Sequence, residues 1–193
     1  MSEPKNLIVG ISGASGVIYG IRLLQMLREI GGLRVHLVMS STARLNIRIE
    51  TDWTVERVAA LADQVHDSRD LTAAIASGSY RTCGMIVAPC SIKTLAAIAS
   101  SNTDTLLSRA ADVVLKERRR LVLMVRETPL HAGHCKLLWD ASNIGAIVAP
   151  PVPAFYNRPT TLDEVITHSV GRVLDLFEID YRKLQRWNGC PAG

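Results

Sequence analysis

Leu7-Ile8-Val9-Gly10-Ile11-Ser12-Gly13-Ala14-Ser15-Gly16 is the stretch that decides the fold. Its apolar half predicts a β-strand buried on both faces, and its glycines predict a tight turn. A helix is expected next, because apolar residues recur at three-residue spacing until Gly31-Gly32 ends the pattern: Ile18, Ile21, Leu24 and Leu27. Glycines let a backbone approach a ligand closely, and the first N–H groups of a helix attract an anion. The sequence therefore predicts a ligand site in this first strand-to-helix turn.

The rest of the chain alternates between short apolar runs and helical patterns. Strands are predicted at Leu7–Ile11, Val35–Met39, Met85–Ala88, Leu121–Val125 and Ala146–Ala149. Later helices are predicted at Thr42–Glu50, Thr54–Ala62, Ser91–Ser100, Thr105–Arg119 and Leu162–Phe177. Such alternation is typical of α/β proteins with a parallel sheet flanked by helices. We expect residues 1–193 to form a single Rossmann-like (flavodoxin-like) domain, with a loose C-terminal tail after about residue 187.

Composition limits the class of protein and its place in the cell. Of the 193 residues, 48% are hydrophobic and 21% are charged, as in soluble globular proteins. The first residues show no basic segment followed by an apolar run, and no apolar run is long enough to span a membrane. The four cysteines, at 83, 90, 135 and 190, form no Cys-x-x-Cys pair and are expected to be reduced thiols. These features predict a cytoplasmic protein without a membrane span.

The Gly-rich turn departs from the common nucleotide-binding patterns. Gly16 is followed by Val17 and Ile18, where a P-loop needs Lys and Ser or Thr. The spacing Gly-x-Gly-x-x-Gly is not matched, and none of the four tyrosines has Lys four residues later, as a short-chain reductase would. The second predicted strand ends at Ser40-Ser41 without the carboxylate that grips an NAD ribose. A mononucleotide is therefore favoured over NAD.

Polar residues also follow the other predicted strands, at the sheet edge where ligands bind. Pro89-Cys90-Ser91-Ile92-Lys93-Thr94 opens a helix and offers hydroxyls and free N–H groups. Arg126-Glu127 places a planar cation that can hold a phosphate beside a carboxylate that can move a proton, although an ordinary ion pair is the alternative. Glu50 is a second candidate acid. Cys90 has no His or acid near it in sequence and is interpreted as structural.

The net charge is +4, and the densest basic run is Lys-Glu-Arg-Arg-Arg at 116–120. This run is either a solvated helix end or part of an anion site, because Arg109 and Lys116 are two helical turns apart and share one face. Nucleic acid is disfavoured as a partner, since exposed aromatics are not interleaved with these charges. The spacing His131-x-x-His134-Cys135 resembles a metal-ligand set, but nothing in the sequence completes it, and no metal is expected.

Six segments in chain order resemble the UbiX family of flavin prenyltransferases. They are Ser-Gly-Ala-Ser-Gly (12–16), Glu-Thr-Asp (50–52), Pro-Cys-Ser-Ile-Lys-Thr (89–94), Arg-Ala-Ala-Asp-Val-Val-Leu-Lys-Glu-Arg-Arg (109–119), Arg-Glu-Thr-Pro-Leu (126–130) and Pro-Pro-Val-Pro-Ala-Phe-Tyr (150–156). The resemblance extends over essentially the whole chain. Arg120 departs from it, because many relatives have Pro there.

The resemblance implies a reaction and a set of site residues. A dimethylallyl group passes from dimethylallyl monophosphate to N5 of reduced FMN, with ring closure at C6, and the prenylated FMN serves a UbiD-type decarboxylase. FMN is expected to be held by Gly13, Ala14, Ser15, Ser40, Ser91, Ile92, Lys93, Thr94 and Arg126. The isoprenoid phosphate is expected to be surrounded by Arg109, Lys116, Arg126, Tyr156 and Arg172, partly across subunit boundaries of a homo-oligomer, a dodecamer in relatives. The catalytic residues are expected to be Ser15, Glu50 and Glu127.

Two other functions stay open at this point. One is an FMN-dependent decarboxylase of the related homo-oligomeric flavoprotein class, although the substrate-clamp motif of that class, rich in Asn and Met before a Trp, is absent. The other is a non-catalytic flavin carrier subunit, which would bind FMN without turnover.

Overall fold

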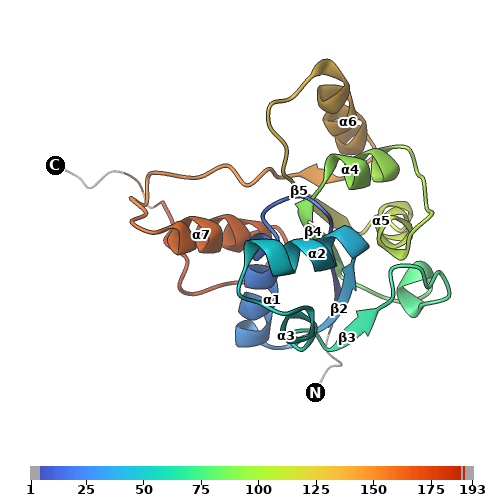
Figure 1. The fold of residues 1–193 in the computed structure, drawn as a ribbon, viewed down its shortest axis with the longest axis horizontal. Coiled ribbons are helices and arrows are strands. Elements are labelled where there is room, and N and C mark those ends of the chain that lie inside the picture. The colour runs from blue at the N-terminus through green and yellow to red at the C-terminus, as the bar shows by residue number, and fades with distance from the viewer. Residues whose placement is uncertain (1–4, 188, 190–193) are drawn as a thin grey trace.

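The computed structural model describes residues 5–187 and 189, and its centre is a six-stranded parallel sheet (Figure 1). The strands are β1 (Lys5–Ile11), β2 (Leu33–Met39), β3 (Gln64–His66), β4 (Gly84–Cys90), β5 (Arg120–Val125) and β6 (Ile147–Val148). The helices are α1 (Ile18–Ile30), α2 (Ser41–Glu50), α3 (Val55–Ala59), α4 (Ile92–Ala99), α5 (Leu106–Lys116), α6 (Ala132–Asn143) and α7 (Leu162–Asp175), with a 3₁₀ turn η1 (Ala74–Ala76).

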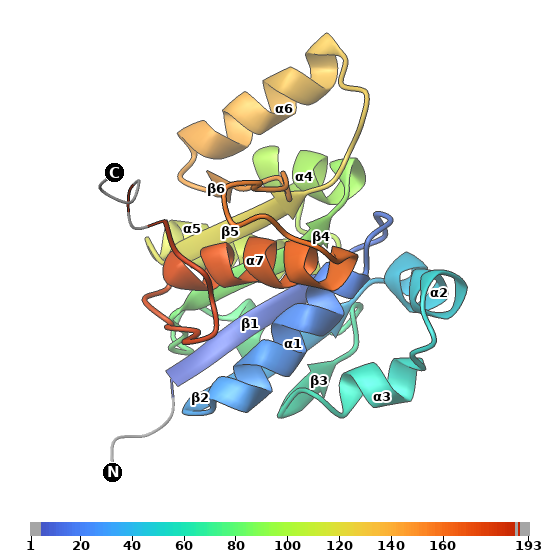
Figure 2. The same cartoon turned by 90° about the vertical axis from the view of Figure 1, so that its left-hand side faces the viewer.

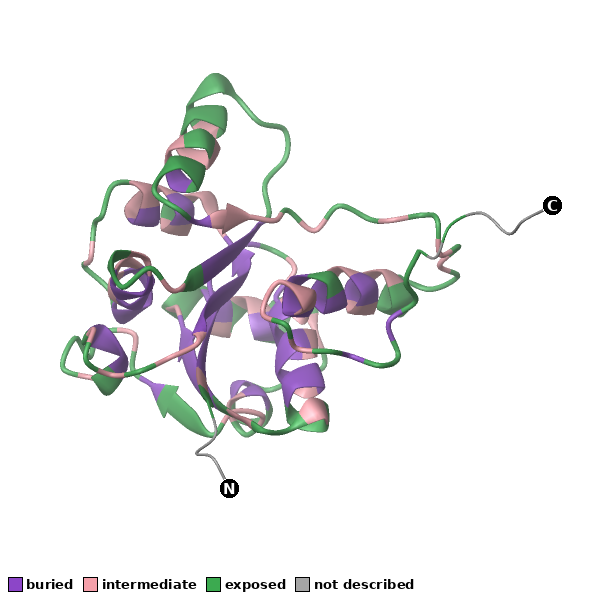
Figure 3. Cartoon of the chain, turned by 180° about the vertical axis from the view of Figure 1, so that it is seen from behind, coloured by how far each residue is buried: buried purple, intermediate pink, exposed green. Residues whose placement is uncertain are grey.

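Helices cover both faces of the sheet, and the alternation of side chains along each strand supplies two separate cores. Leu7, Val9 and Ile11 of β1 pack with apolar residues of α1, α2, α3 and α7, and Figure 2 shows α1 and α7 on this face. Ile8 points to the opposite face and packs with residues of α4, α5 and α6. Figure 3 shows the central strands as buried, whereas the edge strands β3 and β6 and parts of the helices are exposed or intermediate. None of the described helices is long and apolar enough to cross a membrane.

The predicted α/β fold is confirmed, with element ends shifted by one to several residues. The five predicted strands and six predicted helices are present, but β3 and α6 were not predicted. Within β3 only His66 is buried, so the segment has no apolar run to recognise. Within α6 only Ala141 is buried, and Trp139 is 66% exposed, so the helix lacks a clear apolar face. The predicted tail after about residue 187 lies outside the described residues, except for Gly189.

The order β3-β2-β1-β4-β5-β6 places a topological switch point between β1 and β4. If the short edge strand β3 is left out, the order becomes that of flavodoxin-like folds. The turns that follow the two central strands are joined by Ser12, which is fully buried. Its Oγ donates to the carbonyl of Pro89 at 2.8 Å and accepts from the N–H of Ser91 at 2.7 Å. The crevice in which such folds bind ligands is therefore bordered by two turns held in fixed positions.

Candidate functional site

A cavity of about 1120 Å³ opens at the carboxyl ends of β1 to β4, beside the switch point. Its lining comes from the turn after β1, the start of α2, the end of β3 with the segment that follows it, α4, the connection from α4 to α5, and the start of α5. The residues are Gly13, Ser40, Ser41, Thr42, Arg44, Val65, His66, Asp67, Ser68, Arg69, Ser91, Lys93, Thr94, Ala97, Asn102, Asp104, Thr105, Leu107 and Ser108. The volume slightly exceeds the usual range for small-molecule pockets, so a ligand of mononucleotide size fits.

Three helices begin at this cavity, which makes it suitable for an anion. Ser40, Ser91 and Thr105 are the N-cap residues of α2, α4 and α5, and each caps its own helix with its hydroxyl. The hydroxyls of these residues are thus already used by the backbone. The remaining first-turn N–H groups and the positive ends of three helix dipoles stay directed toward the lining. A phosphate bound here would be held mainly by backbone groups.

The Gly-rich turn is shaped by two of its glycines. At Gly13 a Cβ atom would lie 2.6 Å from Cβ of Thr42, so only glycine allows the turn to approach the start of α2 this closely. Gly16 has a φ of 94°, and its N–H donates to the carboxylate of Glu50 at 2.8 Å. The N–H of Val17 donates to the same oxygen at 3.2 Å. Glu50 therefore caps the start of the first helix and joins the Gly-rich turn to the end of α2.

The predicted flavin residues divide into two groups in the structure. Gly13, Ser40, Ser91, Lys93 and Thr94 all line the cavity. The other four lie outside that lining: Ala14, Ser15, Ile92 and Arg126. Of these, Ala14 is buried and Ser15 is exposed in the Gly-rich turn, whereas Ile92 packs on the core below α4.

Arg126 and Glu127 follow β5, and Arg126 lies near Tyr19 of α1. Burial raises the pKa of Tyr19, and the nearby positive charge of Arg126 opposes that rise. Arg126 and Glu127 are both exposed, and the Glu127 carboxylate accepts a hydrogen bond from the N–H of Thr128 at 3.0 Å. Glu127 is therefore available to a ligand without a structural change.

Several residues of the cavity were not predicted from the sequence. Arg44, His66, Arg69, Asn102 and Asp104 belong to the lining. Four of them, all except Arg44, lie in segments that carry no strand or helix pattern, so their position depends on the path of the chain around the sheet edge. For His66 the sequence offers an indirect signal. Its hydrogen-bond partner His36 is a polar residue inside the predicted buried strand Val35–Met39 and therefore needs a polar partner.

A buried hydrogen-bond chain fixes the proton positions of these two histidines. The Asn6 amide nitrogen donates to the carbonyl of Arg81 at 2.9 Å, which directs Asn6 Oδ1 toward His36 Nε2 at 3.2 Å. His36 Nε2 must therefore carry the proton, with Tyr80 Oη also 3.1 Å away. His36 Nδ1 then accepts from His66 Nε2 at 3.0 Å. This leaves Nδ1 of His66, a cavity residue, as a hydrogen-bond acceptor.

We expect His36 to make the stability of the protein fall in mild acid. Burial, and then the charges of His66 and Arg34, lower the pKa of His36 to about 4, while Asp63 acts in the opposite direction. The unfolded chain takes up this proton near the usual value of about 6.5, so the stabilisation is complete above that pH and is lost as the pH falls toward 4. At pH 5 the loss amounts to about 2 kcal/mol of unfolding free energy.

Urea unfolding at pH 7 and pH 5 checks this prediction. The His36→Gln variant should show a smaller decrease in unfolding free energy between the two pH values than the wild type. His131→Gln removes an exposed histidine as the matched control. Equal pH dependence of wild type and His36→Gln would contradict the prediction.

The structure does not bring the five predicted phosphate-binding residues together within one chain. Arg109 and Lys116 lie on α5, where Arg109 pairs with Asp112 at 3.1 Å and Lys116 with Glu117 at 2.6 Å. Neither residue lines the cavity. The prediction that they share one face of the helix agrees with their contacts, because Arg109 donates to the carbonyl of Ala76 and Lys116 lies beside Gly78.

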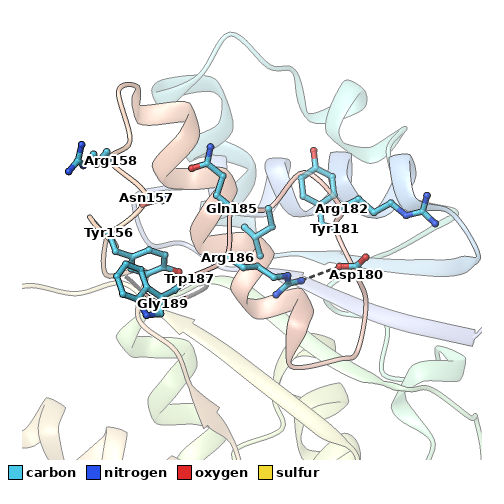
Figure 4. A pocket seen from close by; sticks show the side chains of 11 residues that line it. Tyr156, Asn157, Arg158, Asp180, Tyr181, Arg182, Gln185, Arg186, Trp187 and Gly189 are labelled. Carbon is cyan, nitrogen blue, oxygen red and sulfur yellow. Dashed lines mark hydrogen bonds and ion pairs between the residues drawn. The ribbon is translucent and has the colours of Figure 1, made fainter. Parts of the chain in front are cut away.

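Tyr156 and Arg172 form a separate group near α7. Tyr156 Oη lies 2.9 Å from Nε2 of His168, and the charge of Arg172 helps, after burial, to lower the pKa of that histidine. Figure 4 shows Tyr156 beside Trp187, whose ring centroid is 5.8 Å away, in a second cavity of about 790 Å³. Arg172 itself pairs with Asp175 at 2.6 Å.

Three of the four cysteines, and both histidines of the His131-x-x-His134 motif, are among the described residues. Cys83, Cys90 and Cys135 are unpaired, and full burial strongly raises the pKa of the Cys90 thiol. His131 and His134 contact each other in a tilted arrangement, with ring centroids 3.7 Å apart. Within residues 5–187 and 189, no group of three His, Cys, Asp or Glu side chains converges on a metal-sized site.

Comparison with known proteins places this geometry in a family. The family model described as Flavoprotein matches residues 1–158. Flavin prenyltransferase UbiX of Escherichia coli K12 is 59% identical over 188 residues, which are 96% of this chain and 100% of that protein. The crystal structure of AnUbiX (PadA1) in complex with FMN and dimethylallyl pyrophosphate matches with a TM-score of 0.95 at 49% identity, over 97% of this chain and 99% of that chain.

A second solved structure is a dodecameric FMN-dependent UbiX-like decarboxylase from Escherichia coli O157:H7. It matches with a TM-score of 0.93 at 50% identity, over 95% of this chain and 100% of that chain. Fold, sequence and full-length coverage agree across these relatives. The chain therefore belongs to the UbiX-type family of flavin prenyltransferases.

Proposed function

We propose that this protein is a flavin prenyltransferase that transfers a dimethylallyl group from dimethylallyl monophosphate to reduced FMN. The observation that carries the proposal is the cavity at the switch point, which combines five of the predicted flavin residues with the starts of three helices. Its size and its anion-binding backbone suit FMN. The solved relative that holds FMN and dimethylallyl pyrophosphate supports both ligands. Residues 1–193 would act as one catalytic domain.

FMN is the substrate that this cavity would hold. Reduced FMN supplies N5 and C6, the two atoms to which the isoprenoid becomes joined. The helix starts at Ser40, Ser91 and Thr105 would bind its phosphate. His66 offers a hydrogen-bond acceptor through Nδ1, suited to a hydroxyl or ring N–H of the flavin. Ser15, exposed in the Gly-rich turn, would place its hydroxyl near N5.

Cationic residues would drive cleavage of the isoprenoid ester. The C–O bond breaks, and the electron pair leaves with the phosphate, so charge that develops on the phosphate oxygens needs stabilisation. Arg126 would contribute its positive charge from the same subunit that holds the flavin. Arg109, Lys116, Tyr156 and Arg172 supply further cations and a hydroxyl donor. Such an ionisation requires no metal when enough cations surround the leaving phosphate.

Ring closure at C6 releases one proton, which needs an acceptor. Glu127 has an accessible carboxylate whose described partner is the N–H of the next residue. Glu50 is the last residue of α2, and its carboxylate accepts hydrogen bonds from the N–H groups of Gly16 and Val17, which follow Ser15 in the chain. The released phosphate is the third possible acceptor. We assign the proton transfer to this set, with Glu127 as the residue freest to take part.

The separation of the predicted phosphate-binding residues supports a site built from several subunits. Arg109 and Lys116 lie on α5, Tyr156 and Arg172 near α7, and Arg126 at the end of β5. One chain therefore presents parts of more than one site. The dodecameric relative supports a homododecamer as the active assembly.

The product would be prenylated FMN, and its recipient a UbiD-type decarboxylase. We place the reaction in the cytoplasm, where a supply of reduced flavin is maintained. The recipient follows from the family resemblance, and the location is the one predicted from the sequence features.

Anaerobic incubation of the protein with reduced FMN and dimethylallyl monophosphate tests the proposal. Mass spectrometry of the flavin should show the gain of one isoprene unit, and a parallel reaction with the pyrophosphate would establish which ester is used. An unchanged flavin mass with both esters would overturn the proposal and favour a flavin carrier. Release of CO₂ from a hydroxybenzoate by the purified protein alone would favour the decarboxylase.

A further inference from the structure

The loop of residues 76–80, whose first residue is the last of η1, is held on the side of α5 that carries Arg109 and Lys116. Three of its backbone carbonyls accept hydrogen bonds from cationic side chains. Arg109 Nε donates to the carbonyl of Ala76 at 3.2 Å. Arg119 Nη1 donates to Tyr80 at 2.8 Å, and Arg119 Nη2 to Gly78 at 2.7 Å. The loop is thus bound by both ends of the α5 segment.

Arg119 reaches this loop because the chain reverses directly after α5. Arg118 adopts a φ of 56°, and the N–H of Arg119 donates back to the carbonyl of Val114 at 2.9 Å. The Arg119 side chain is only 18% exposed, whereas Arg118 is exposed and makes no side-chain hydrogen bond to the described residues. Two adjacent arginines therefore differ in role, and only one is fixed by the fold.

Gly78 is the point at which the loop contacts the ion pair of Lys116 and Glu117. A Cβ atom at Gly78 would overlap Oε1 of Glu117 and lie 2.8 Å from Nζ of Lys116. The same Glu117 carboxylate holds Lys116 at 2.6 Å and lies 4.0 Å from Arg119. The loop thus packs directly against the Lys116–Glu117 pair, and its position limits where the Lys116 ammonium can stand.

We propose that Arg119 and Gly78 are positioning residues for the isoprenoid phosphate. Arg119 holds the 76–80 loop, and Gly78 in that loop sets the place of Lys116 relative to Arg109. This inference rests on the proposed function, because it takes Arg109 and Lys116 as phosphate ligands. The binding of a phosphate by two cations depends on the distance between those cations. Loss of the contacts that Arg119 and Gly78 make therefore weakens phosphate binding and leaves the flavin cavity unchanged.

The affinity for dimethylallyl monophosphate tests this inference, measured by calorimetry on protein loaded with oxidised FMN. This measurement needs no turnover, so absence of prenyl transfer by the wild type would overturn the proposed function and leave the inference to be judged by binding. Arg119→Gln should raise the dissociation constant for the phosphate ester about tenfold, with the FMN affinity within about twofold of wild type. Arg118→Gln, which removes the same charge one residue away, should leave both unchanged.

Two further variants separate positioning from folding. Arg119→Lys keeps the charge but not the two-pronged donation, and should recover only part of the affinity. Gly78→Ala displaces the Lys116–Glu117 pair while Arg119 stays in place, and should weaken the phosphate ester selectively even if Arg119→Gln does not fold. Equal ester affinities in Arg119→Gln and Arg118→Gln, or a parallel loss of FMN affinity in Gly78→Ala, would overturn the inference.

Discussion

Replacing Glu127 with glutamine is expected to leave FMN binding unchanged and to slow formation of prenylated FMN at least about 100-fold. The substitution keeps the shape of the side chain and the oxygen that accepts from the N–H of Thr128. It removes only the ability to accept a proton. Because Glu127 is exposed and makes no other side-chain hydrogen bond to the described residues, the fold should not change.

Anaerobic single-turnover reactions, followed by mass spectrometry of the flavin, measure this effect. The exposed Glu56 on α3 gives a matched control, and Glu56→Gln should react like the wild type. A Glu127→Gln variant that forms product at the wild-type rate would show that the proton leaves by another route, through Glu50 or the released phosphate.

Glu50 is a less direct test of catalysis than its sequence motif indicates. From the family resemblance alone, Glu50→Ala should retain FMN and impair product formation. In the structure, however, the carboxylate holds the N–H groups of Gly16 and Val17, so alanine would also release the Gly-rich turn. Glutamine preserves one acceptor oxygen and is the more informative substitution here. Only a loss of product without a loss of FMN affinity would assign Glu50 a catalytic role.

The sequence predicted those parts of the fold in which local pattern and burial agree. The strands β1, β2, β4 and β5 are apolar runs because they are covered on both faces, and α1 shows its buried face at regular spacing. The edge strand β3 and the exposed helix α6 lack that signal, since each buries one residue. Their positions depend on the neighbouring elements rather than on their own residues.

The candidate site was predictable only where a ligand-binding turn follows directly after a strand. Gly13, Ser40 and Ser91 stand in turns of this kind, and all three line the cavity. Arg44 and Arg69 were missed, because a single arginine on a polar helix or loop looks like a solvated surface residue. Likewise, the helical spacing of Arg109 and Lys116 predicts their shared face but not that they lie apart from Tyr156 and Arg172. The separation of those two groups could be seen only in the three-dimensional structure.

Replacing Gly13 with alanine is expected to weaken FMN binding about 100-fold. The added Cβ would lie 2.6 Å from Cβ and 2.8 Å from Cγ2 of Thr42, distances that packed carbon atoms do not adopt. The Gly-rich turn must therefore move away from α2, and with it one wall of the cavity. Titration of FMN against the quenching of its fluorescence measures the affinity, and thermal unfolding reports whether the fold itself is retained.

The clash between a Cβ at position 13 and the Thr42 side chain can also be removed by substituting Thr42, which makes the explanation testable. Thr42→Gly deletes the atoms that the new Cβ meets, so the double variant Gly13→Ala with Thr42→Gly should recover most of the FMN affinity of Thr42→Gly alone. If the losses of FMN binding free energy in the two single variants simply add in the double variant, the loss at Gly13 comes from contact between the new methyl group and the flavin. Recovery instead establishes that Gly13 acts by allowing the turn and α2 to approach, so that backbone groups from both can reach one phosphate.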